Sequence, residues 1–328
     1  MTQHSIAVVI CAYTQNRWNE LVAAIKSVQL QTLPPKEIIV VIDHNPNLLE
    51  LVREHVSDVI VVENTETAGL SGARNSGIAV AKSDIVAFLD DDAVAAPNWL
   101  MLLSEEFADL HVLGVGGAVH PTWMGNKPDW FPEEFYWVVG CTYRGMPQAS
   151  KTIRNPIGAN MSLRREVFDA VGGFRSEIGR VGTRPVGCEE TELCIRARKR
   201  WPQNVVLYQP QASVSHSIPD NRASWHYFCS RCYAEGLSKA VVTQYVGSKD
   251  SLASERTYTL RTLPQGVVRN LKQTLLYHDP AGLARAGAIV VGLVMTTMGY
   301  LVGSIFSRTA TSKKTITESV LNSSLETS

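Results

Sequence analysis

Residues 84–97, "DIVAFLDDDAVAAP", join an apolar run directly to a cluster of three acids. The segment 85–89 is typical of a buried β-strand, and Asp90, Asp91 and Asp92 follow it without a spacer. Adjacent carboxylates repel one another, so such a cluster either faces solvent or holds a positive charge. An isolated run of three aspartates is more often a solvated loop, so the surrounding sequence has to decide between the two.

Three earlier segments share the apolar character of the strand at 84–90, and segments with helical spacing alternate with them. We expect strands at 6–13, 37–43, 58–64 and 84–90, and helices at 19–30, 47–55 and 73–81. This alternation predicts an α/β fold with a mostly parallel sheet covered on both faces. Ligands bind at the carboxyl ends of strands in such sheets, where Tyr13, Asp43 and Asp90 stand. These three side chains are therefore expected to converge on one rim.

The position of the acidic cluster at this rim favours a cation, because hard divalent cations with few protein ligands usually bridge to phosphate oxygens. Phosphate is then the expected substrate group. A second acidic cluster, Glu189, Glu190 and Glu192, lies at the start of a helix predicted at 188–200. The helix dipole explains one or two of these acids, which leaves room for one of them to act as a general base.

The pattern is less regular after residue 120. The stretch 121–137, "PTWMGNKPDWFPEEFYW", has no clean period and is expected to form long loops over the edge of the sheet. Further along we expect a helix at 165–171, strand-like segments at 204–210 and 212–216, and a helix starting near Ser224.

Composition narrows the class of protein. With 45% hydrophobic and 19% charged residues, the 328-residue chain can bury a core. Lys+Arg and Asp+Glu balance at 31 each, so no overall basic field would recruit nucleic acid. The six cysteines lack two close pairs at zinc-site spacing, which favours reduced thiols in the cytoplasm. The first residues carry no basic region before an apolar run, so no signal peptide is expected.

The segment 286–306 has 21 residues without a charge between Arg285 and Arg308. At about 1.5 Å per residue it can cross a hydrocarbon core of about 30 Å, so we expect a membrane-spanning helix. A buried helix and one lying in the membrane interface are the alternatives. Gly299 and Gly303 fit a GxxxG helix contact. Basic residues flank both ends and do not choose an orientation, and the Ser/Thr-rich tail 307–328 is expected to be disordered.

Six segments, in this order, resemble family 2 glycosyltransferases, which are inverting nucleotide-sugar enzymes of the GT-A fold. They are "VVICAY" (8–13) followed by Arg17, "IIVVID" (38–43), "GLSGARNSGI" (69–78), "VAFLDDDAV" (86–94), "NPIGANMSLRREVFDAVGGF" (155–174) and "EETELCIRAR" (189–198). The resemblance covers residues 5–240. It implies transfer of one sugar from a nucleotide-diphosphate-sugar donor to a glycan or lipid-linked acceptor, in cell-envelope or lipid-linked glycan synthesis.

The resemblance also implies roles for residues at the donor site. Tyr13 and Arg17 would lie beside the nucleoside base, Asp43 would bind the uracil or its equivalent, and Arg74 would line the nucleotide pocket. The DXD motif of the family falls on three residues that would contact the ribose and diphosphate: Asp90, Asp91 and Asp92.

Two further donor-site roles follow from the same resemblance. Asp92 would ligate a Mg²⁺ or Mn²⁺ that neutralises the departing diphosphate, and His216 stands where a second ligand is often found. A lone histidine is as often a satisfied structural residue. Asn160 would line the donor-sugar pocket.

The catalytic pair of the family falls on Glu189 and Glu190, which assigns Glu190 as the general base. A glutamate replaces the usual aspartate there, so Glu189 is an alternative. The segment "ARKRW" (197–201) has Ala197 where processive synthases carry glutamine, so we expect one sugar per encounter. Three cations from the region of the late helix could meet an anionic acceptor or lipid headgroups: Arg222, Arg231 and Lys239.

On this basis the chain is divided into five parts. Residues 1–115 would form the nucleotide-sugar-binding half and 116–245 the acceptor and catalytic-base half of one GT-A domain. Residues 246–285 would be linker helices, 286–306 the membrane helix and 307–328 the tail. The protein would then sit at the cytoplasmic face of the cell membrane with a single pass.

Three other functions fit parts of the sequence. A haloacid-dehalogenase-like phosphohydrolase would use Asp90 as nucleophile and Asp92 as acid, although that fold normally opens with this strand. A non-catalytic, membrane-tethered protein that binds sugar nucleotides would bind donor and metal without turnover. A nucleotidyltransferase is weaker, since no glycine-rich, lysine-bearing phosphate loop lies near the start.

Overall fold

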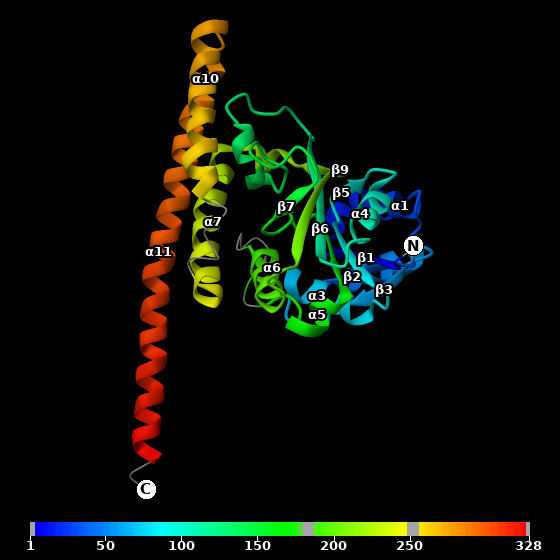
Figure 1. Cartoon of the computed structure of the whole chain (residues 1–328). Helices are drawn as coiled ribbons and strands as arrows, with labels where there is room; N and C mark the ends of the chain where they lie inside the picture. The colour runs from blue at the N-terminus through cyan, green and yellow to red at the C-terminus, as the bar shows by residue number, and fades with distance from the viewer. Residues whose placement is uncertain (1–3, 177, 179–186, 248–255, 326–328) are drawn as a thin grey trace.

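A long helix stands beside an α/β domain in the computed structural model of the chain (Figure 1). The structure describes residues 4–176, 178, 187–247 and 256–325, and their side chains as far as Ile305. The α/β domain begins at the amino terminus, and the long helix ends the described chain far from it (Figure 1).

The sheet has nine strands in the order β3-β2-β1-β4-β8-β6-β9-β5, and β7 pairs with β9. The strands are β1 (Ile6–Ala12), β2 (Glu37–Ile42), β3 (Ile60–Glu63), β4 (Ile85–Asp90), β5 (Ala93–Ala95), β6 (Val112–Trp123), β7 (Lys151–Ile153), β8 (Asn160–Arg164) and β9 (Val205–Ile218). The first four are parallel, and β8 joins β4 in the antiparallel sense. Cys11 of β1 lies opposite Asp90 of β4, so both strands end at one rim.

The helices surround the sheet and continue beyond it. They are α1 (Trp18–Gln29), α2 (Pro46–His55), α3 (Leu70–Val80), α4 (Trp99–Glu106), α5 (Arg165–Val171), α6 (Glu189–Arg200), α7 (Trp225–Val246), α10 (Leu263–Tyr277) and α11 (Pro280–Leu325). Short 3₁₀ segments are η1 (Gln15–Arg17), η2 (Glu133–Val139) and η3 (Asp220–Ala223), and η4 (Tyr258–Thr262) is a π-helix.

Alternate residues of the central strands face two different cores. Val8 and Ile10 of β1 pack in one core with side chains of α1, α2 and α4. Val9 packs in the other, with side chains of α3, α5 and α6. Because successive strand residues point to opposite faces, an uninterrupted apolar strand must be covered on both. The predicted α/β fold with a mostly parallel, doubly covered sheet is confirmed.

The sequence analysis missed β6, a strand near the middle of the sheet. Its sequence, "VLGVGGAVHPTW", holds three glycines and a proline, residues that are depleted in strands. At Gly117 the reason is close packing, because a Cβ there would lie 1.7 Å from the carbonyl oxygen of Ala212 on β9. β9 is one bulged strand where two pieces were expected.

The expected loops at 121–137 are only partly correct. The stretch begins inside β6, which runs to Trp123, and it ends in the 3₁₀ helix η2. The expected helix at 73–81 begins three residues earlier, at Leu70, after Gly69. Ser224 caps α7, as its predicted start requires, because its side chain accepts a hydrogen bond from the backbone N–H of Tyr227.

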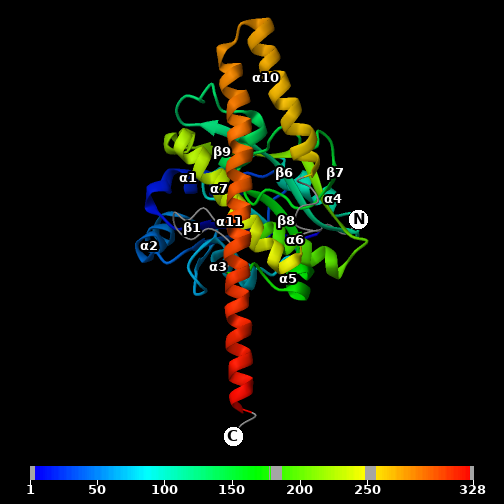
Figure 2. The ribbon, with the colours of Figure 1, turned by 90° about the vertical axis from the view of Figure 1, so that its left-hand side faces the viewer.

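α11 is packed against the α/β domain through α7. A Cβ on Gly299 would lie 2.0 Å from the carbonyl oxygen of Tyr233, and one on Gly236 would lie 2.1 Å from that of Thr296. The predicted glycine contact at Gly299 and Gly303 is therefore made within this chain, against α7. Figure 2, which looks onto α11, shows the helix crossing in front of the whole domain.

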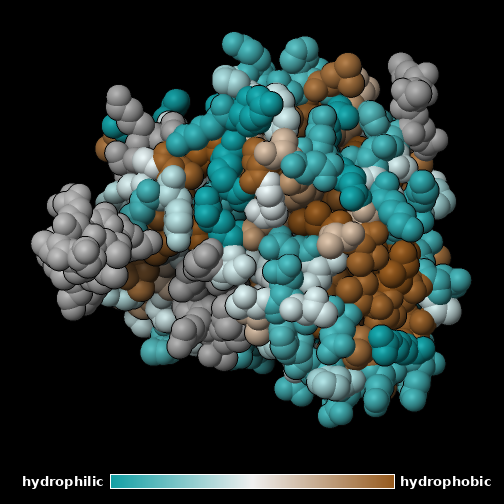
Figure 3. Space-filling view, turned by 90° about the horizontal axis from the view of Figure 1, so that it is seen from below, coloured by the Kyte–Doolittle hydropathy of each residue, from teal (hydrophilic) through white to brown (hydrophobic). Residues whose placement is uncertain are grey.

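The other face of α11 is apolar and exposed. Among the described residues, Pro280–Ile305 is the one segment long and apolar enough to cross a membrane. The large apolar side chains on its outer face are Leu283, Val290, Val294, Met298, Leu301 and Ile305. On the underside of the molecule a separate apolar area lies on the side of the domain opposite α11 (Figure 3). Division of the chain into five parts stays a prediction.

Candidate active site

A cavity of about 1160 Å³ lies at the rim where β1, β2 and β4 end. The predicted side chains Tyr13, Asp43 and Asp90 all line it, as their positions at strand ends require. The opposite wall comes from η2, α7, η4 and α11, so segments distant in the sequence close one space. The cavity is slightly larger than the pockets of about 300–1000 Å³ that usually hold one small ligand.

In the acidic cluster Asp91 and Asp92 are buried, Asp90 is partly exposed, and the carboxylates are paired with cations. Nη1 of Arg17 lies 2.9 Å from Oδ1 of Asp91 and 3.1 Å from Oδ2 of Asp92. Nε2 of His216 lies 2.9 Å from the other oxygen of Asp92. His216 belongs to β9 and pairs with Ala93 of β5, directly after the cluster, so its imidazole lies beside Asp92. The cluster is therefore a closed network rather than the solvated loop that an isolated run of aspartates suggests.

Burial and charge move the two buried carboxyls in opposite directions. Burial, together with the neighbouring charge of Asp92, raises the pKa of Asp91. Burial also raises the pKa of Asp92, but His216 and then Arg17 outweigh it and hold that pKa well below its usual range. Asp92 is thus kept as an anion, the form that a cation or a guanidinium requires.

The residues present fit a divalent cation. One ligand atom each from Asp90, Asp92 and His216 lies within 4.8 Å of the others. Oδ2 of Asp91 is buried without a hydrogen-bond partner beside them. Carboxylate oxygens suit hard cations and an imidazole nitrogen suits transition metals, so a mixed set of this kind accepts either type. In the part of the chain that the structure describes, this is the one such cluster.

Arg74 connects the acidic cluster to the start of α6. Its Nη1 lies 2.9 Å from Oε1 of Glu189, and its Nη2 lies 3.5 Å from Oδ1 of Asp90. Nη2 also donates to the carbonyl oxygen of Gly158. The guanidinium is almost fully buried and lies over the ring of Phe174. Arg74 is therefore a fixed cation of the cavity rather than an exposed helix charge.

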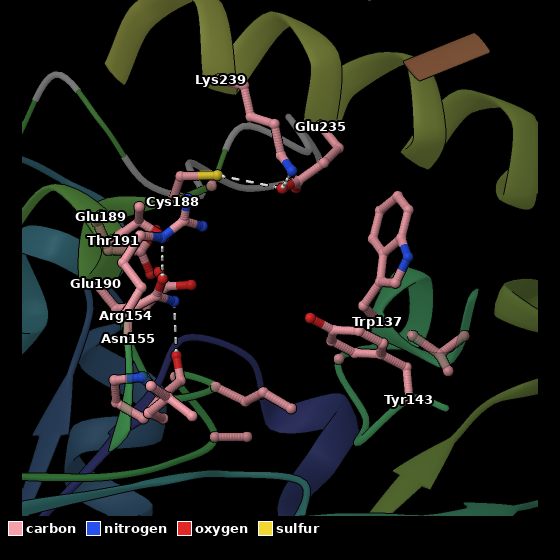
Figure 4. Close-up of a pocket in the computed structure, with 18 of the residues that line it drawn as sticks. Trp137, Tyr143, Arg154, Asn155, Cys188, Glu189, Glu190, Thr191, Glu235 and Lys239 are labelled. Carbon is pink, nitrogen blue, oxygen red and sulfur yellow. Dashed lines mark hydrogen bonds and ion pairs between the residues drawn. The ribbon is translucent and has the colours of Figure 1, made fainter. Parts of the chain in front are cut away.

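Glu190 differs from its neighbour in having no cation partner among the described residues. Glu189 is held by Arg74, whereas the carboxyl of Glu190 faces the cavity (Figure 4). Burial and then the charge of Glu189 raise the pKa of Glu190 to about 8. A carboxyl with a pKa near the working pH is suited to proton transfer. The geometry therefore favours Glu190 over Glu189 as a general base.

The turn before Glu189 and Glu190 has an unusual backbone. Cys188 has φ +74°, in the left-handed region, which residues with a side chain rarely adopt. α7 holds this turn, because the N–H of Gly187 donates to Oγ of Ser238 and Sγ of Cys188 donates to Oε1 of Glu235. The position of the acids at the start of α6 thus depends on α7.

Asp43 lies at the end of β2 with both oxygens engaged. Nδ2 of Asn64 donates to Oδ1 at 2.6 Å, and the backbone N–H of Gly69 donates to Oδ2 at 2.9 Å. Tyr13 is about half exposed, and the guanidinium of Arg17 lies over its ring at 5.5 Å. Both residues line the cavity as predicted, beside the acidic cluster.

Asn160 does not line the cavity, in contrast to the sequence-based expectation. Its side chain is fully buried, and Nδ2 donates to the carbonyl oxygens of Ala118 and Ala212. Its Oδ1 accepts from Nε1 of Trp99 at 2.8 Å. These bonds tie β6, β9 and α4 together, so the side chain stabilises the sheet. Its neighbour Ala159 does line the cavity.

Aromatic residues that were not predicted from the sequence to line a site form part of the wall opposite Glu190. Figure 4 shows Trp137 and Tyr143 across the cavity from Glu190. Nε1 of Trp137 donates to the hydroxyl of Tyr258, which donates to the carbonyl oxygen of Glu134. The irregular stretch at 121–137 gave no periodic signal for this wall, although its crowded aromatic residues were visible.

The three late cations separate into two places. Nη1 of Arg222 lies 3.8 Å from Oδ2 of Asp92, beside the acidic cluster. Arg231 and Lys239 lie on α7 on either side of Glu235, near the start of α6. The three cations that were grouped together from the sequence therefore lie at two separate places in the structure.

A comparison with known protein families finds one match. The family described as "Glycosyl transferase family 2" matches residues 7–172. A curated relative, the glucosyl-dolichyl phosphate glucuronosyltransferase of Haloferax volcanii, is 33% identical over 306 residues, which is 91% of this chain and 96% of that protein. The succinoglycan biosynthesis protein ExoM of Rhizobium meliloti is 25% identical over 70% of this chain and 72% of its own length.

Two solved structures share the fold. The mannosyltransferase PcManGT from Pyrobaculum calidifontis, in complex with GDP-Man and Mn²⁺, matches with a TM-score of 0.56 and 16% identity over 90% of this chain and 88% of that one. GalNAc-T7 with UDP, GalNAc and Mn²⁺ matches with a TM-score of 0.50 and 18% identity over 66% of this chain and 43% of that one. At these identities the structures establish the GT-A fold.

Proposed function

This chain belongs to glycosyltransferase family 2 and is a nucleotide-sugar-dependent glycosyltransferase, and we propose that it adds one sugar, with inversion, to a lipid-linked acceptor. The Haloferax relative, which matches almost end to end, is named for transfer of a glucuronosyl group to glucosyl-dolichyl phosphate. A hexuronic acid donor and a sugar on a polyprenyl-type phosphate are therefore the substrates that we propose first.

The observation that carries this proposal is that Glu190 shares one cavity with the acidic cluster. Asp90, Asp92 and His216 form the cation-binding side, and Arg74 joins that side to Glu189 next to the base. A transferase that inverts needs the leaving group and the base on opposite sides of the anomeric carbon. The haloacid-dehalogenase alternative has no such use for Glu190.

Each charged group has a task in this mechanism. Asp90, Asp92 and His216 would hold a Mg²⁺ or Mn²⁺, which supplies charge neutralisation for the departing nucleoside diphosphate when bound. Arg17 and Arg74 place two further cations on the same side of the cavity.

Glu190 would take the proton of the acceptor hydroxyl as its oxygen attacks the anomeric carbon. The glycosidic bond forms, the bond to the diphosphate breaks on the opposite face, and the anomeric configuration inverts. The side chain of Tyr13 and the bonded Asp43 lie where a nucleoside would enter. The proposed donor-binding residues are therefore Tyr13, Arg17, Asp43, Arg74, Asp90 and Asp91.

The membrane side of the proposal rests on α11. Its outer face is apolar, and its inner face contributes Leu293, Thr296, Thr297 and Tyr300 to the cavity lining. The helix therefore borders the substrate space instead of following a linker. Because this segment packs against α7 and lines the cavity, it cannot cross a bilayer in this arrangement without taking the domain into it. We propose a location at the cytoplasmic face of the membrane, with the exposed apolar face of α11 lying in the membrane interface.

The test uses the detergent-purified full chain with Mn²⁺, a panel of UDP-, GDP- and TDP-sugars, and a polyprenyl-phosphate-linked glucose acceptor. We expect one sugar to be added, by mass spectrometry, and the product to have the anomeric configuration opposite to that of the donor, by NMR. Retention of configuration, addition of several sugars, or release of free phosphate alone would each contradict the proposal.

A further inference from the structure

Three charged residues form a ladder along the face of α7 that borders the cavity. Arg231, Glu235 and Lys239 follow one another at intervals of four residues, so their side chains share one side of the helix. All three line the cavity. Nη2 of Arg231 lies 3.4 Å from Oε2 of Glu235, and Nζ of Lys239 lies 3.8 Å from Oε1. The ladder spans about 12 Å along the helix axis.

The charge of the ladder suits a singly charged anion. Two cations and one carboxylate give the three side chains a formal net charge of +1. Only 9% of the Arg231 side chain and 21% of the Lys239 side chain are exposed, so their charges act where water screens them weakly. A phosphodiester carries one negative charge and offers acceptor oxygens to both cations.

The ladder lies next to the proposed base. A Cβ on Gly187 would lie 3.4 Å from Nη2 of Arg231, and Gly187 stands three residues before Glu190. Glu235 accepts from Cys188 in the same turn. Figure 4 shows Glu235 and Lys239 on α7 above the start of α6. A phosphate at the ladder would therefore lie beside the turn that carries Glu190.

The cavity continues from the ladder toward apolar helices. Phe135, Leu263 and Leu293 line it on that side, and α10 and α11 lie beyond, with apolar outer faces. A ligand with a phosphate at the ladder could thus extend an apolar chain along these helices toward a membrane. A free sugar phosphate has no apolar chain, so it would gain nothing from these helices.

We propose that Arg231 and Lys239 form the subsite for the phosphodiester of a lipid-linked sugar acceptor, which rests on the proposed function and specifies its acceptor side. The acceptor sugar then reaches Glu190 while its lipid leaves along α10 and α11. Arg222, although close in sequence, belongs to the donor side through Asp92.

The test compares three acceptors with one sugar: glucose on a polyprenyl phosphate, octyl glucoside, and glucose 1-phosphate. Lys239→Gln and Arg231→Gln in the full chain should raise KM for the phospholipid acceptor roughly 10- to 100-fold, the range for losing a charge-assisted hydrogen bond. KM for octyl glucoside and for the donor should stay unchanged. Lys239 is partly exposed, so its variant should fold even where that of the buried Arg231 does not.

Lys26→Gln is the matched control, since it removes an exposed cation of α1 outside the cavity and should change neither KM. An equal loss with octyl glucoside and the phospholipid would overturn the subsite, because it would show a structural effect. If the wild-type chain had the same KM for octyl glucoside and for glucose on a polyprenyl phosphate, the subsite would also be overturned, while the proposed function would stand. If the KM values for glucose 1-phosphate and for glucose on a polyprenyl phosphate were equal, the proposed path of the lipid along α10 and α11 would be wrong. If the wild-type chain does not use glucose on a polyprenyl phosphate, both proposals fail.

Discussion

The cavity has a proposed donor side, formed by the acidic cluster with Arg17, Arg74 and His216, and a proposed acceptor wall, formed by η2, α7, η4 and α11. The two hold their charges differently. On the donor side, Arg17–Asp91, Arg74–Glu189 and His216–Asp92 are each paired at 2.9 Å. On the acceptor wall, the pairs of Arg231 and Lys239 with Glu235 measure 3.4 and 3.8 Å. Each of these donor-side carboxylates thus has a cation of its own, which preorganises the groups for a diphosphate and its cation, whereas on α7 two cations share the carboxylate of Glu235.

The two sides also differ in construction. The donor side is made at strand ends, where hydrogen-bonded register fixes each side chain relative to its neighbour. The acceptor wall is made by helix packing, with α11 held to α7 through glycines. Variants on one side should therefore affect one substrate and leave the other substrate unaffected.

The largest expected effect comes from Asp92→Ala on the donor side. Transfer should fall at least about 10³-fold and lose its dependence on Mn²⁺, because the variant removes the residue that joins His216 and Arg17. Steady-state kinetics with varied Mn²⁺ would measure this. Asp84→Ala, at the start of β4 and outside the cavity, is the aspartate control. A large change in acceptor KM in the Asp92 variant would contradict the claim that each side of the cavity serves one substrate.

The next effect concerns the acceptor wall. Gly299→Ala places a Cβ 2.0 Å from a backbone oxygen of α7, so α11 must shift outward. We expect a loss of about 1–3 kcal/mol in the free energy of unfolding and a roughly tenfold rise in acceptor KM, with donor affinity unchanged. Thermal unfolding and kinetics in detergent would test this. Gly287→Ala meets no atom within 4 Å and should be neutral or slightly stabilising. Similar behaviour of the two variants would contradict the role of the helix contact.

The pH dependence of transfer should report the protonation state of Glu190, which stands where the two sides of the cavity meet. Because the pKa of Glu190 is raised to about 8, its basic form is the minor one at pH 7, and kcat/KM should rise about tenfold per pH unit up to pH 8. Glu189→Gln removes the charge that helps to raise this pKa, so the rise should move to lower pH. A profile that is flat from pH 6 to 9, or unmoved in Glu189→Gln, would exclude Glu190 as the titrating base.

The smallest effect on catalysis should come from Asn160, a donor-motif residue that the structure places in the core. Asn160→Ala should lower the free energy of unfolding by about 1–3 kcal/mol, since it leaves Nε1 of Trp99 without its partner. KM for the donor should stay within about twofold at temperatures where the variant is folded. Chemical denaturation and donor titration would separate the two, and a selective rise in donor KM without destabilisation would return Asn160 to the sugar pocket.

The donor side could be predicted from the sequence because its signals are local. A strand such as 84–90 carries its own periodicity, and the acids at its end are adjacent in the chain. Tyr13, Asp43 and Asp90 were expected at one rim for that reason, and all three line the cavity. Asn160 was misplaced because motif position does not reveal which way a buried side chain is bonded.

The acceptor wall could not be predicted in the same way. The stretch 121–137 has no clean period, so nothing local showed that η2 would form part of this wall. The segment 286–306 looks like an isolated membrane helix, because nothing local shows that Gly299 contacts α7. Contacts of this kind join residues far apart in the chain, which periodicity and motifs do not record.

The most direct test of the whole account is Glu190→Gln, measured three ways in one preparation. Calorimetric titration with nucleoside diphosphate and Mn²⁺ should match the wild type, binding of the lipid-linked acceptor should match it too, and the rate of transfer should fall about 10²- to 10⁴-fold. That result would place the base where donor and acceptor sides meet. Transfer within a fewfold of the wild-type rate, with both substrates bound normally, would contradict it.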